Sequence, residues 1–155
     1  MKPRLRRRAK LAGDRAGNIL IEFALGSVIL VMAFVGTFQF GYTFLQYNNL
    51  ENVVARGARY ASLIPYDSTT TTPSAAFSSA VKNMVLYGSS TAGTSPALPG
   101  LATTNVNLTV TFANGVPSAM TVSISGYAIN AVVAASTLTN KPKVTYAYQG
   151  IWNPI

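Results

Sequence analysis

The sequence has 155 residues, which is enough for one compact domain together with an extended element. It contains no cysteine and no histidine, and the three carboxylates after residue 17 are far apart in the sequence. These counts exclude disulfides and give no support to a zinc site, a histidine-based catalytic site or a carboxylate pair. We therefore expect a protein that is not an enzyme and holds no cofactor or metal.

The formal net charge of +8 is concentrated at the N-terminus. Residues 1–17 contain seven basic residues and one acidic residue, whereas the rest of the chain contains five basic and three acidic residues. The basic tail stands directly before a long apolar segment, an arrangement that directs membrane insertion rather than nucleic-acid binding. We expect no nucleic-acid partner.

The run 23–50 carries no charged residue. About 20 apolar residues in a helix span the roughly 30 Å hydrocarbon core of a bilayer, so a transmembrane part is predicted at about 20–44. The positive-inside rule then predicts a cytoplasmic N-terminus and an exported remainder. A secretory signal fits less well, because its apolar core is about 7–15 residues long and precedes a cleavage site. A buried core helix fits poorly too, because few residues remain to surround it.

Helical spacing continues beyond the apolar run. One face collects the apolar residues that recur at intervals of three and four: Leu50, Val53, Val54, Gly57, Ala58, Ala61 and Ile64. Pro65 ends the helix, because the residue before a proline is biased away from helical geometry. The pattern predicts one long helix over 18–64, with an amphipathic second half.

The segment 65–155 predicts a small domain. A helix is expected over 74–87, where apolar residues recur at helical spacing and Gly88 provides a C-terminal stop. Strict alternation between apolar and polar residues follows further along the chain and is typical of strands. The amphipathic half of the long helix can cover the apolar face of such a sheet.

Three strands are expected after this helix. Alternation predicts the first two over 106–112 and 120–125, and Asn114–Gly115 between them is a strong hairpin signal. The third is expected over 143–149, and the short apolar run 127–136 is ambiguous between helix and strand. The predicted fold class is α+β: a long N-terminal helix packed on a small antiparallel sheet.

One acidic residue stands near the start of the apolar segment. An ionised carboxylate inside a membrane helix costs about 2.5–3.5 kcal/mol on insertion scales, so Glu22 is expected to have a partner. If the chain is cut after Gly17, the new ammonium group at Asn18 of one subunit can pair with Glu22 of its neighbour and fix their register. Alternatively, Glu22 lies at the headgroup boundary and favours the helix N-terminus.

The stretch RRRAKLAGDRAG, followed by NILIEFAL, resembles the class III leader of type IV pilins. Such leaders are short and basic, and are cut on the cytoplasmic side after a glycine that leaves glutamate fifth in the product. The match is closest to the TadE-like minor pseudopilins of tight-adherence pili, through GxxxxEFAL, a helix rich in phenylalanine and glycine, and NVVARGARYAS. It covers roughly residues 13–63.

The resemblance implies a processing glycine at Gly17, a first mature residue at Asn18, and an assembly pair at Glu22 and Phe23. The first mature residue is therefore not the methylated phenylalanine of type IVa pilins, which fits the tight-adherence branch. The implied organisation is a leader over 1–17, the long helix, and an extracytoplasmic domain.

The implied function is that of a structural or assembly subunit, a minor pseudopilin of a tight-adherence pilus. The expected partners are the bacterial inner membrane, a prepilin peptidase, other pilins or pseudopilins and the assembly machinery, with no small-molecule substrate. We expect a single-pass protein with a periplasmic C-terminal domain, which enters an extracellular pilus on assembly. Two alternatives are a pseudopilin of a secretion system and an uncleaved single-span protein that displays an adhesive or ligand-binding domain.

Overall fold

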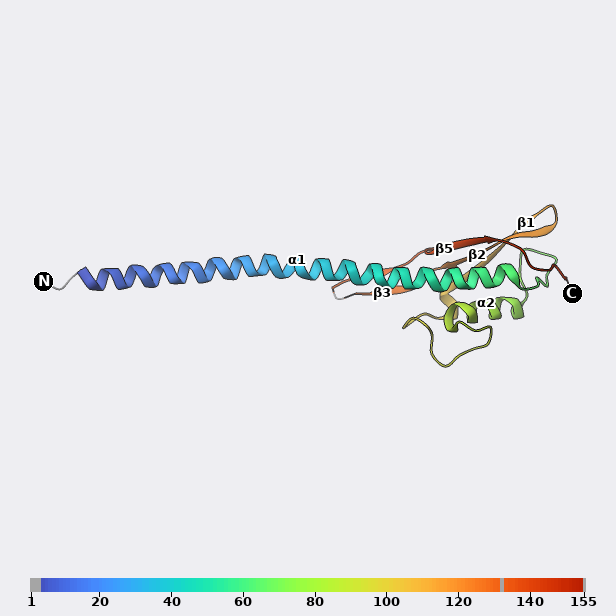
Figure 1. Cartoon of the computed structure of the whole chain (residues 1–155), viewed down its shortest axis with the longest axis horizontal. Helices are drawn as coiled ribbons and strands as arrows, with labels where there is room; N and C mark the ends of the chain where they lie inside the picture. Colours follow the sequence, from blue (N-terminus) through green and yellow to red (C-terminus); the bar gives the residue numbers. More distant parts are fainter. Residues whose placement is uncertain (1–3, 132, 155) are drawn as a thin grey trace. The chain divides into compact units, whose positions relative to one another are not determined.

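A computed structural model describes the backbone of residues 4–131 and 133–154, and the side chains of residues 17–131 and 133–154. The chain divides into two compact units, Met1–Gly41 (unit 1) and Tyr42–Ile155 (unit 2). Helix α1, Arg4–Leu63, contributes to both (Figure 1). The helix begins at Arg4, earlier than the predicted 18–64. The residues before Asn18 include several strong helix formers, which favour this extension.

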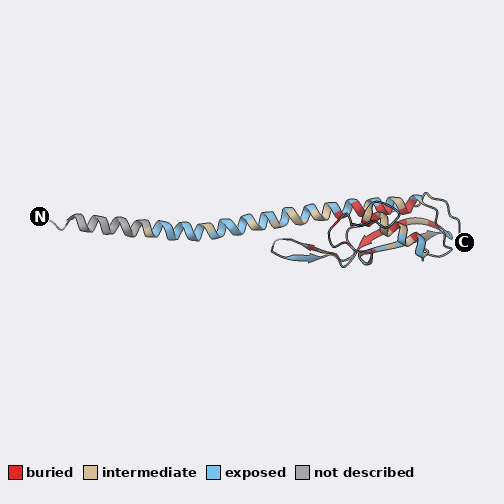
Figure 2. Ribbon diagram, turned by 90° about the horizontal axis from the view of Figure 1, so that it is seen from below, coloured by how far each residue is buried: buried red, intermediate tan, exposed pale blue. Residues whose placement is uncertain are grey.

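In unit 2, the second half of α1 supplies one wall of the hydrophobic core. The predicted apolar face is confirmed, since Leu50, Val54, Ala58 and Ala61 have no exposed surface. Figure 2 shows these buried positions as the red part of α1. The helix ends at Leu63, two residues before Pro65, as the restriction on the residue before proline predicts.

Helix α2, Ala75–Tyr87, confirms the second predicted helix. The Ser74 hydroxyl caps its N-terminus by accepting the Phe77 N–H at 3.0 Å. Gly88 adopts a left-handed conformation with φ of 73° at its C-terminus and donates its N–H to the Met84 carbonyl. Phe77 and two valines of α2 are buried in the core.

The contact between α1 and α2 requires a glycine. A Cβ atom added at Gly57 would lie 2.2 Å from Cγ2 of Val85 and 3.7 Å from the Val81 carbonyl oxygen. Any side chain at position 57 would have to displace Val85, which is buried in the core, so the close packing of the two helices as observed depends on glycine here.

The main sheet has three antiparallel strands in the order β1-β2-β5. They are β1, Val106–Ala113, β2, Val116–Ile124, and β5, Lys143–Ala147, at the three predicted positions. Asn114 and Gly115 join the first two with φ of 52° and 80°, values that suit the tight turn predicted there.

The ambiguous run 127–136 forms two short strands that pair with each other: β3, Ala128–Asn130, and β4, Ala135–Thr137, which extends one residue beyond the run. The 3₁₀ helix η1, Thr103–Asn105, leads into β1. Strand pairing rather than local pattern decides the structure of this run.

One face of the main sheet packs into the core. Val106 and Val110 of β1 and Met120, Val122 and Ile124 of β2 are buried and belong to one cluster with α1 and α2. Because β2 is the central strand, Thr121 on its opposite face is also buried, and its hydroxyl lies 2.8 Å from that of Thr145.

The segment 148–153, which we call the C-terminal clamp, is hydrogen-bonded to residues 62–68, which are the end of α1 and the residues that follow it. The Tyr148 hydroxyl accepts the Tyr66 N–H at 2.8 Å and lies 3.0 Å from the Ile64 carbonyl oxygen, to which it can donate. The indole N–H of Trp152 donates to the Ser68 carbonyl at 3.0 Å. Burial raises the pKa of Tyr148, so its hydroxyl keeps the proton that it donates.

Candidate processing and assembly site

The four residues expected to act in processing and assembly, Gly17, Asn18, Glu22 and Phe23, all lie on α1 in unit 1. Asn18 and Glu22 are exposed, and Phe23 is 74% exposed. Asn18 and Glu22 are four residues apart, so they lie on the same side of the helix, one turn from each other. The structure therefore groups these two on one face. The side chains of residues 1–16, most of the predicted leader, lie outside the described part of the chain.

The peptide bond between Gly17 and Asn18 is helical in this structure. A peptidase can reach it only after the helix unwinds locally. Glycine disfavours a helix interior by about 1 kcal/mol relative to alanine, so Gly17 marks a point where unwinding costs less than at its neighbours. A glycine also lets the backbone approach a protein surface closely.

The rest of unit 1 is apolar and uncovered. Its large apolar side chains between Ile19 and Phe40 are more than half exposed, apart from the partly buried Val35, and they point outward all round the helix. The stretch Gly17–Leu63 is long and apolar enough, by length and composition, to cross a membrane. This confirms the predicted apolar helix.

The hydroxyl groups of Ser27 and Thr37, both in unit 1, donate hydrogen bonds to backbone carbonyls of α1 itself. Ser27 donates to the Ala24 carbonyl at 2.8 Å, and Thr37 donates to the Ala33 carbonyl at 2.9 Å. In lipid, polar groups have no water to bond with, and such backbone bonds are how membrane helices accommodate Ser and Thr.

Glu22 is the one formal charge among the described side chains of unit 1, residues 17–41. It forms no ion pair with any described residue of this unit, because that range contains no basic side chain. A partner for the carboxylate must therefore come from residues 1–16, from a new N-terminal amine, from lipid headgroups or from another molecule. The predicted assembly role requires such a carboxylate, one that has no counter-charge within its own unit and can pair with a neighbouring subunit.

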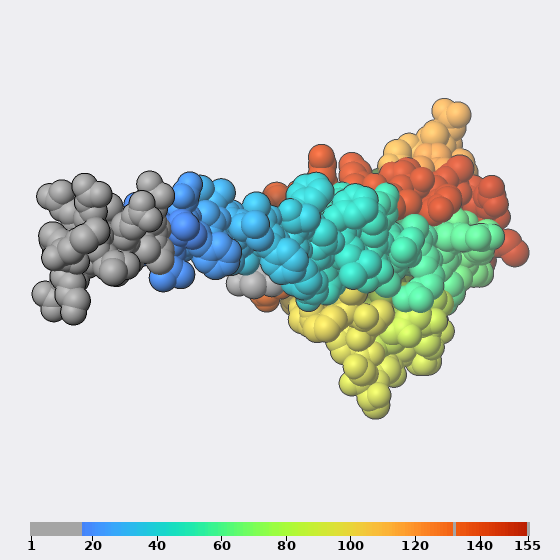
Figure 3. All heavy atoms as spheres, turned by 60° about the vertical axis from the view of Figure 1, so that its left-hand side comes forward, coloured from blue at the N-terminus to red at the C-terminus, as the bar shows by residue number. Residues whose placement is uncertain are grey.

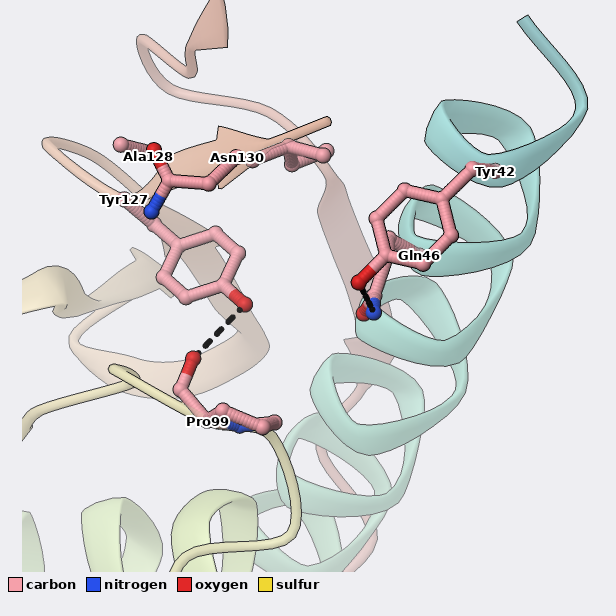
Figure 4. Close-up of a pocket in the computed structure, with 7 residues that line it drawn as sticks. Tyr42, Gln46, Pro99, Tyr127, Ala128 and Asn130 are labelled. Atoms are coloured by element: carbon pink, nitrogen blue, oxygen red, sulfur yellow. Dashed lines mark hydrogen bonds between the residues drawn. The ribbon is translucent and has the colours of Figure 1, made fainter. Parts of the chain in front are cut away.

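Unit 2 contains a small polar cavity that the sequence did not indicate (Figure 4). Its volume is about 100 Å³, and it is lined by Tyr42, Gln46, Pro99, Tyr127, Ala128, Ile129 and Asn130. The Tyr127 hydroxyl donates to the Pro99 carbonyl at 3.1 Å, and the Gln46 amide donates to the Tyr42 hydroxyl at 3.0 Å. Burial raises the pKa of Tyr127. Ligand sites for metabolites are typically about 300–1,000 Å³, so this cavity is too small for one.

Among the residues that the structure describes, no cluster of three or more Asp, Glu, His or Cys side chains could hold a metal ion. The features of this part of the chain that stand out chemically are thus the bare apolar helix and its single carboxylate.

Comparison with known proteins gives one match. The family model described as "TadE-like protein" matches residues 17–59, a range that begins at Gly17 and includes Glu22, Phe23 and Gly57. This confirms the resemblance seen in the sequence. No curated protein and no solved structure matches the chain.

Proposed function

We propose that this chain, which is TadE-like over residues 17–59, is a membrane-inserted minor pseudopilin, a structural and assembly subunit of a tight-adherence pilus. One observation carries the proposal. The family match begins at a glycine that stands five residues before Glu22, the single carboxylate among the described side chains of unit 1. A folded unit follows the same helix, so one chain combines a membrane or filament segment with an exported domain.

The exposure of unit 1 supports this function. Large side chains such as Leu30 and Phe34 are 71% exposed, and water is an unfavourable environment for such a surface. Lipid covers these side chains before assembly, and helices of neighbouring pilins cover them afterwards. The chain thus joins the pilus through its helix.

We propose that the N-terminus is cytoplasmic and that unit 2 is periplasmic, because the basic residues of the tail precede the apolar segment. A reporter enzyme that works only in the periplasm should be active when fused after residue 155. A reporter that works only in the cytoplasm should be inactive at the same point. The opposite pair of results would reverse the orientation.

We propose that a prepilin peptidase removes residues 1–17. Protein isolated from membranes should begin at Asn18, and Gly17→Leu should accumulate as the full-length precursor, because leucine stabilises the helix and blocks close backbone approach. N-terminal sequencing and gel mobility measure both results. Gly26→Leu is the matched control: Gly26 also lies on α1 with open space around it, and its replacement should leave cleavage unchanged.

The same experiment separates the proposal from its alternatives. An uncleaved single-span protein would keep its original N-terminus in both variants and in the unmodified chain. A pseudopilin of a secretion system would be cleaved but would be absent from sheared surface filaments, so fractionation of the filaments distinguishes it from a pilus subunit.

A further inference from the structure

The short hairpin formed by β3 and β4 carries exposed apolar side chains at its tip. Val133 is 69% exposed, and Ala134 and Ala135 after it are exposed as well. Figure 2 shows the hairpin as a narrow ribbon, with β4 in pale blue, that projects from the folded body of unit 2. No charged residue occurs in the sequence between Lys82 and Lys141, so the hairpin is uncharged. A single exposed valine is ordinary on a protein surface, so the place of the hairpin in unit 2 decides what it means.

The hairpin lies at the end of unit 2 where α1 enters it. Tyr42 and Gln46 of α1 line the small cavity on one side, and the segment Tyr127–Asn130, which contains β3, lines it on the other (Figure 4). Ile129 of β3 is buried in the same core cluster as Leu50 of α1. β3 is therefore held beside the first turns of α1 in unit 2, and the hairpin tip continues from there.

The surface of α1 changes from apolar to polar at the same place. Exposed large apolar side chains continue along the helix from Ile19 to Leu45, and Phe44 and Leu45 themselves are more than half exposed. The polar stretch 46–49, QYNN, follows directly. Tyr42 stands just before this change, and tyrosine is enriched at the boundary between lipid and water. The pattern indicates a bilayer boundary close to Leu45, beside β3.

We propose that Val133, Ala134 and Ala135 at the hairpin tip form a second membrane contact, which enters the interfacial layer of the bilayer that α1 crosses. The inference rests on the membrane-inserted topology of the proposed function. The contact needs little apolar area, because α1 already holds the hairpin at the bilayer and so gives it a high effective concentration there. An uncharged tip also avoids the cost of moving a charge toward lipid.

A second contact restricts the orientation of unit 2 at the membrane. A single transmembrane helix anchors the unit but allows it to tilt relative to the bilayer surface. The hairpin lies to one side of the helix, so its contact with lipid opposes that tilt. Because the tip buries only small side chains, the contact is weak enough to break when the helix leaves the bilayer for the pilus.

A fluorescent label measures whether the tip meets lipid, because the chain has no cysteine of its own. The full chain is reconstituted in phosphatidylcholine vesicles with an environment-sensitive fluorophore on Val133→Cys. Its emission should be blue-shifted relative to the same label on Val116→Cys. Lipids that carry a nitroxide near the headgroup should quench it several-fold more strongly than they quench the label at position 116.

Val116→Cys is the matched control because it places the label on another exposed valine, at the far end of unit 2. The β1–β2 turn lies beside the residues that follow α1, since the rings of Phe112 and Tyr66 are in edge contact at 5.9 Å. Figure 3 shows this hairpin in light orange, next to the red C-terminal segment. From Tyr42 to Leu63 the helix rises about 30 Å, at 1.5 Å per residue, so the two labels report opposite ends of the unit.

A third label, on Leu30→Cys, reports whether α1 crosses the bilayer. Strong quenching at position 30 by nitroxides deep in the acyl chains, with equally weak quenching at positions 133 and 116, would overturn this inference and leave the proposed topology intact. Weak quenching at all three positions would contradict the membrane insertion of the proposed function. Blue-shifted emission at position 133 that no lipid nitroxide quenches would indicate cover by protein and would also overturn the lipid contact.

A charge at the tip provides a second measurement. With the label on Ala135→Cys, Val133→Asp should reduce quenching several-fold, because a carboxylate is costly to move into the bilayer. Val133→Leu should keep or increase the quenching, and Val116→Asp should leave the label at position 135 unaffected. Unchanged quenching in the Val133→Asp chain would contradict a membrane contact at the hairpin tip.

Discussion

Replacing Gly57 with leucine should prevent unit 2 from folding stably. Even a single Cβ at this position would lie 2.2 Å from Cγ2 of Val85, and leucine adds three further carbon atoms. Overpacking by one or two methylenes typically costs about 1–3 kcal/mol, so a larger group in this contact removes a large part of the roughly 5–15 kcal/mol that holds a domain together. Rapid proteolysis of unit 2 in the full chain should report the loss.

Smaller substitutions at the same contact test whether the clash with Val85 is the cause of this loss of stability. Gly57→Ala should lower the free energy of unfolding by about 1–3 kcal/mol, although alanine favours the helix. Val85→Ala should recover part of that loss in the double variant, because it removes the Cγ2 atom in question. Urea unfolding of the detergent-solubilised chain measures both.

Gly41→Leu, at a glycine of α1 with no atom within 4 Å of its added Cβ, should leave stability unchanged. Equal tolerance of leucine at both glycines would show that α1 and α2 do not meet at Gly57.

Glu22→Gln should be inserted and cleaved normally but should fail to assemble. Glutamine is less costly than an ionised carboxylate to place in lipid, so insertion improves or stays the same. If Glu22 pairs with the N-terminal ammonium of a neighbouring Asn18 in a stack of helices, as the resemblance implies, the amide leaves that ammonium without its counter-charge. An unpaired buried charge typically costs about 3–5 kcal/mol, enough to reduce the equilibrium for each contact by more than a hundredfold.

The measurement is cofractionation with sheared surface filaments, together with N-terminal sequencing. Glu22→Asp is the matched control, since it keeps the charge on a shorter side chain and should retain part of the assembly. Normal assembly of fully cleaved Glu22→Gln protein would show that the carboxylate lies at the headgroups or pairs within its own chain. It would then have no part in the register between subunits.

Local signals in the sequence were sufficient for most of the secondary structure of unit 2. Pro65 predicted the end of α1, Asn114–Gly115 predicted the hairpin, and alternation predicted the strands on either side of it. The run 127–136 stayed ambiguous because a short apolar stretch fits a helix or a strand equally well, and only the pairing of β3 with β4 decides between them.

Contacts between distant segments could not be predicted in the same way. Nothing near Gly57 in the sequence indicates that it faces Val85, and nothing near Tyr148 indicates that its hydroxyl meets the backbone of Tyr66. For the candidate site the limit is different. The sequence identifies Glu22 as an unpaired charge, but its counter-charge is not among the described residues of unit 1, so a single chain cannot reveal it.

The C-terminal clamp has a consequence for when unit 2 can be completed. Its hydrogen bonds join residues 62–68 to residues 148–153, so under the proposed topology they cannot form until residues 148–153 have crossed the membrane. The backbone N–H of Gln149 then bonds to the Ser62 carbonyl, and that of Asn153 bonds to the Tyr66 carbonyl, both at 2.9 Å. A chain that stalls during translocation, or is truncated before Tyr148, keeps the end of α1 open to proteases. Only subunits that contain residues 148–153 can therefore close unit 2 over the end of α1.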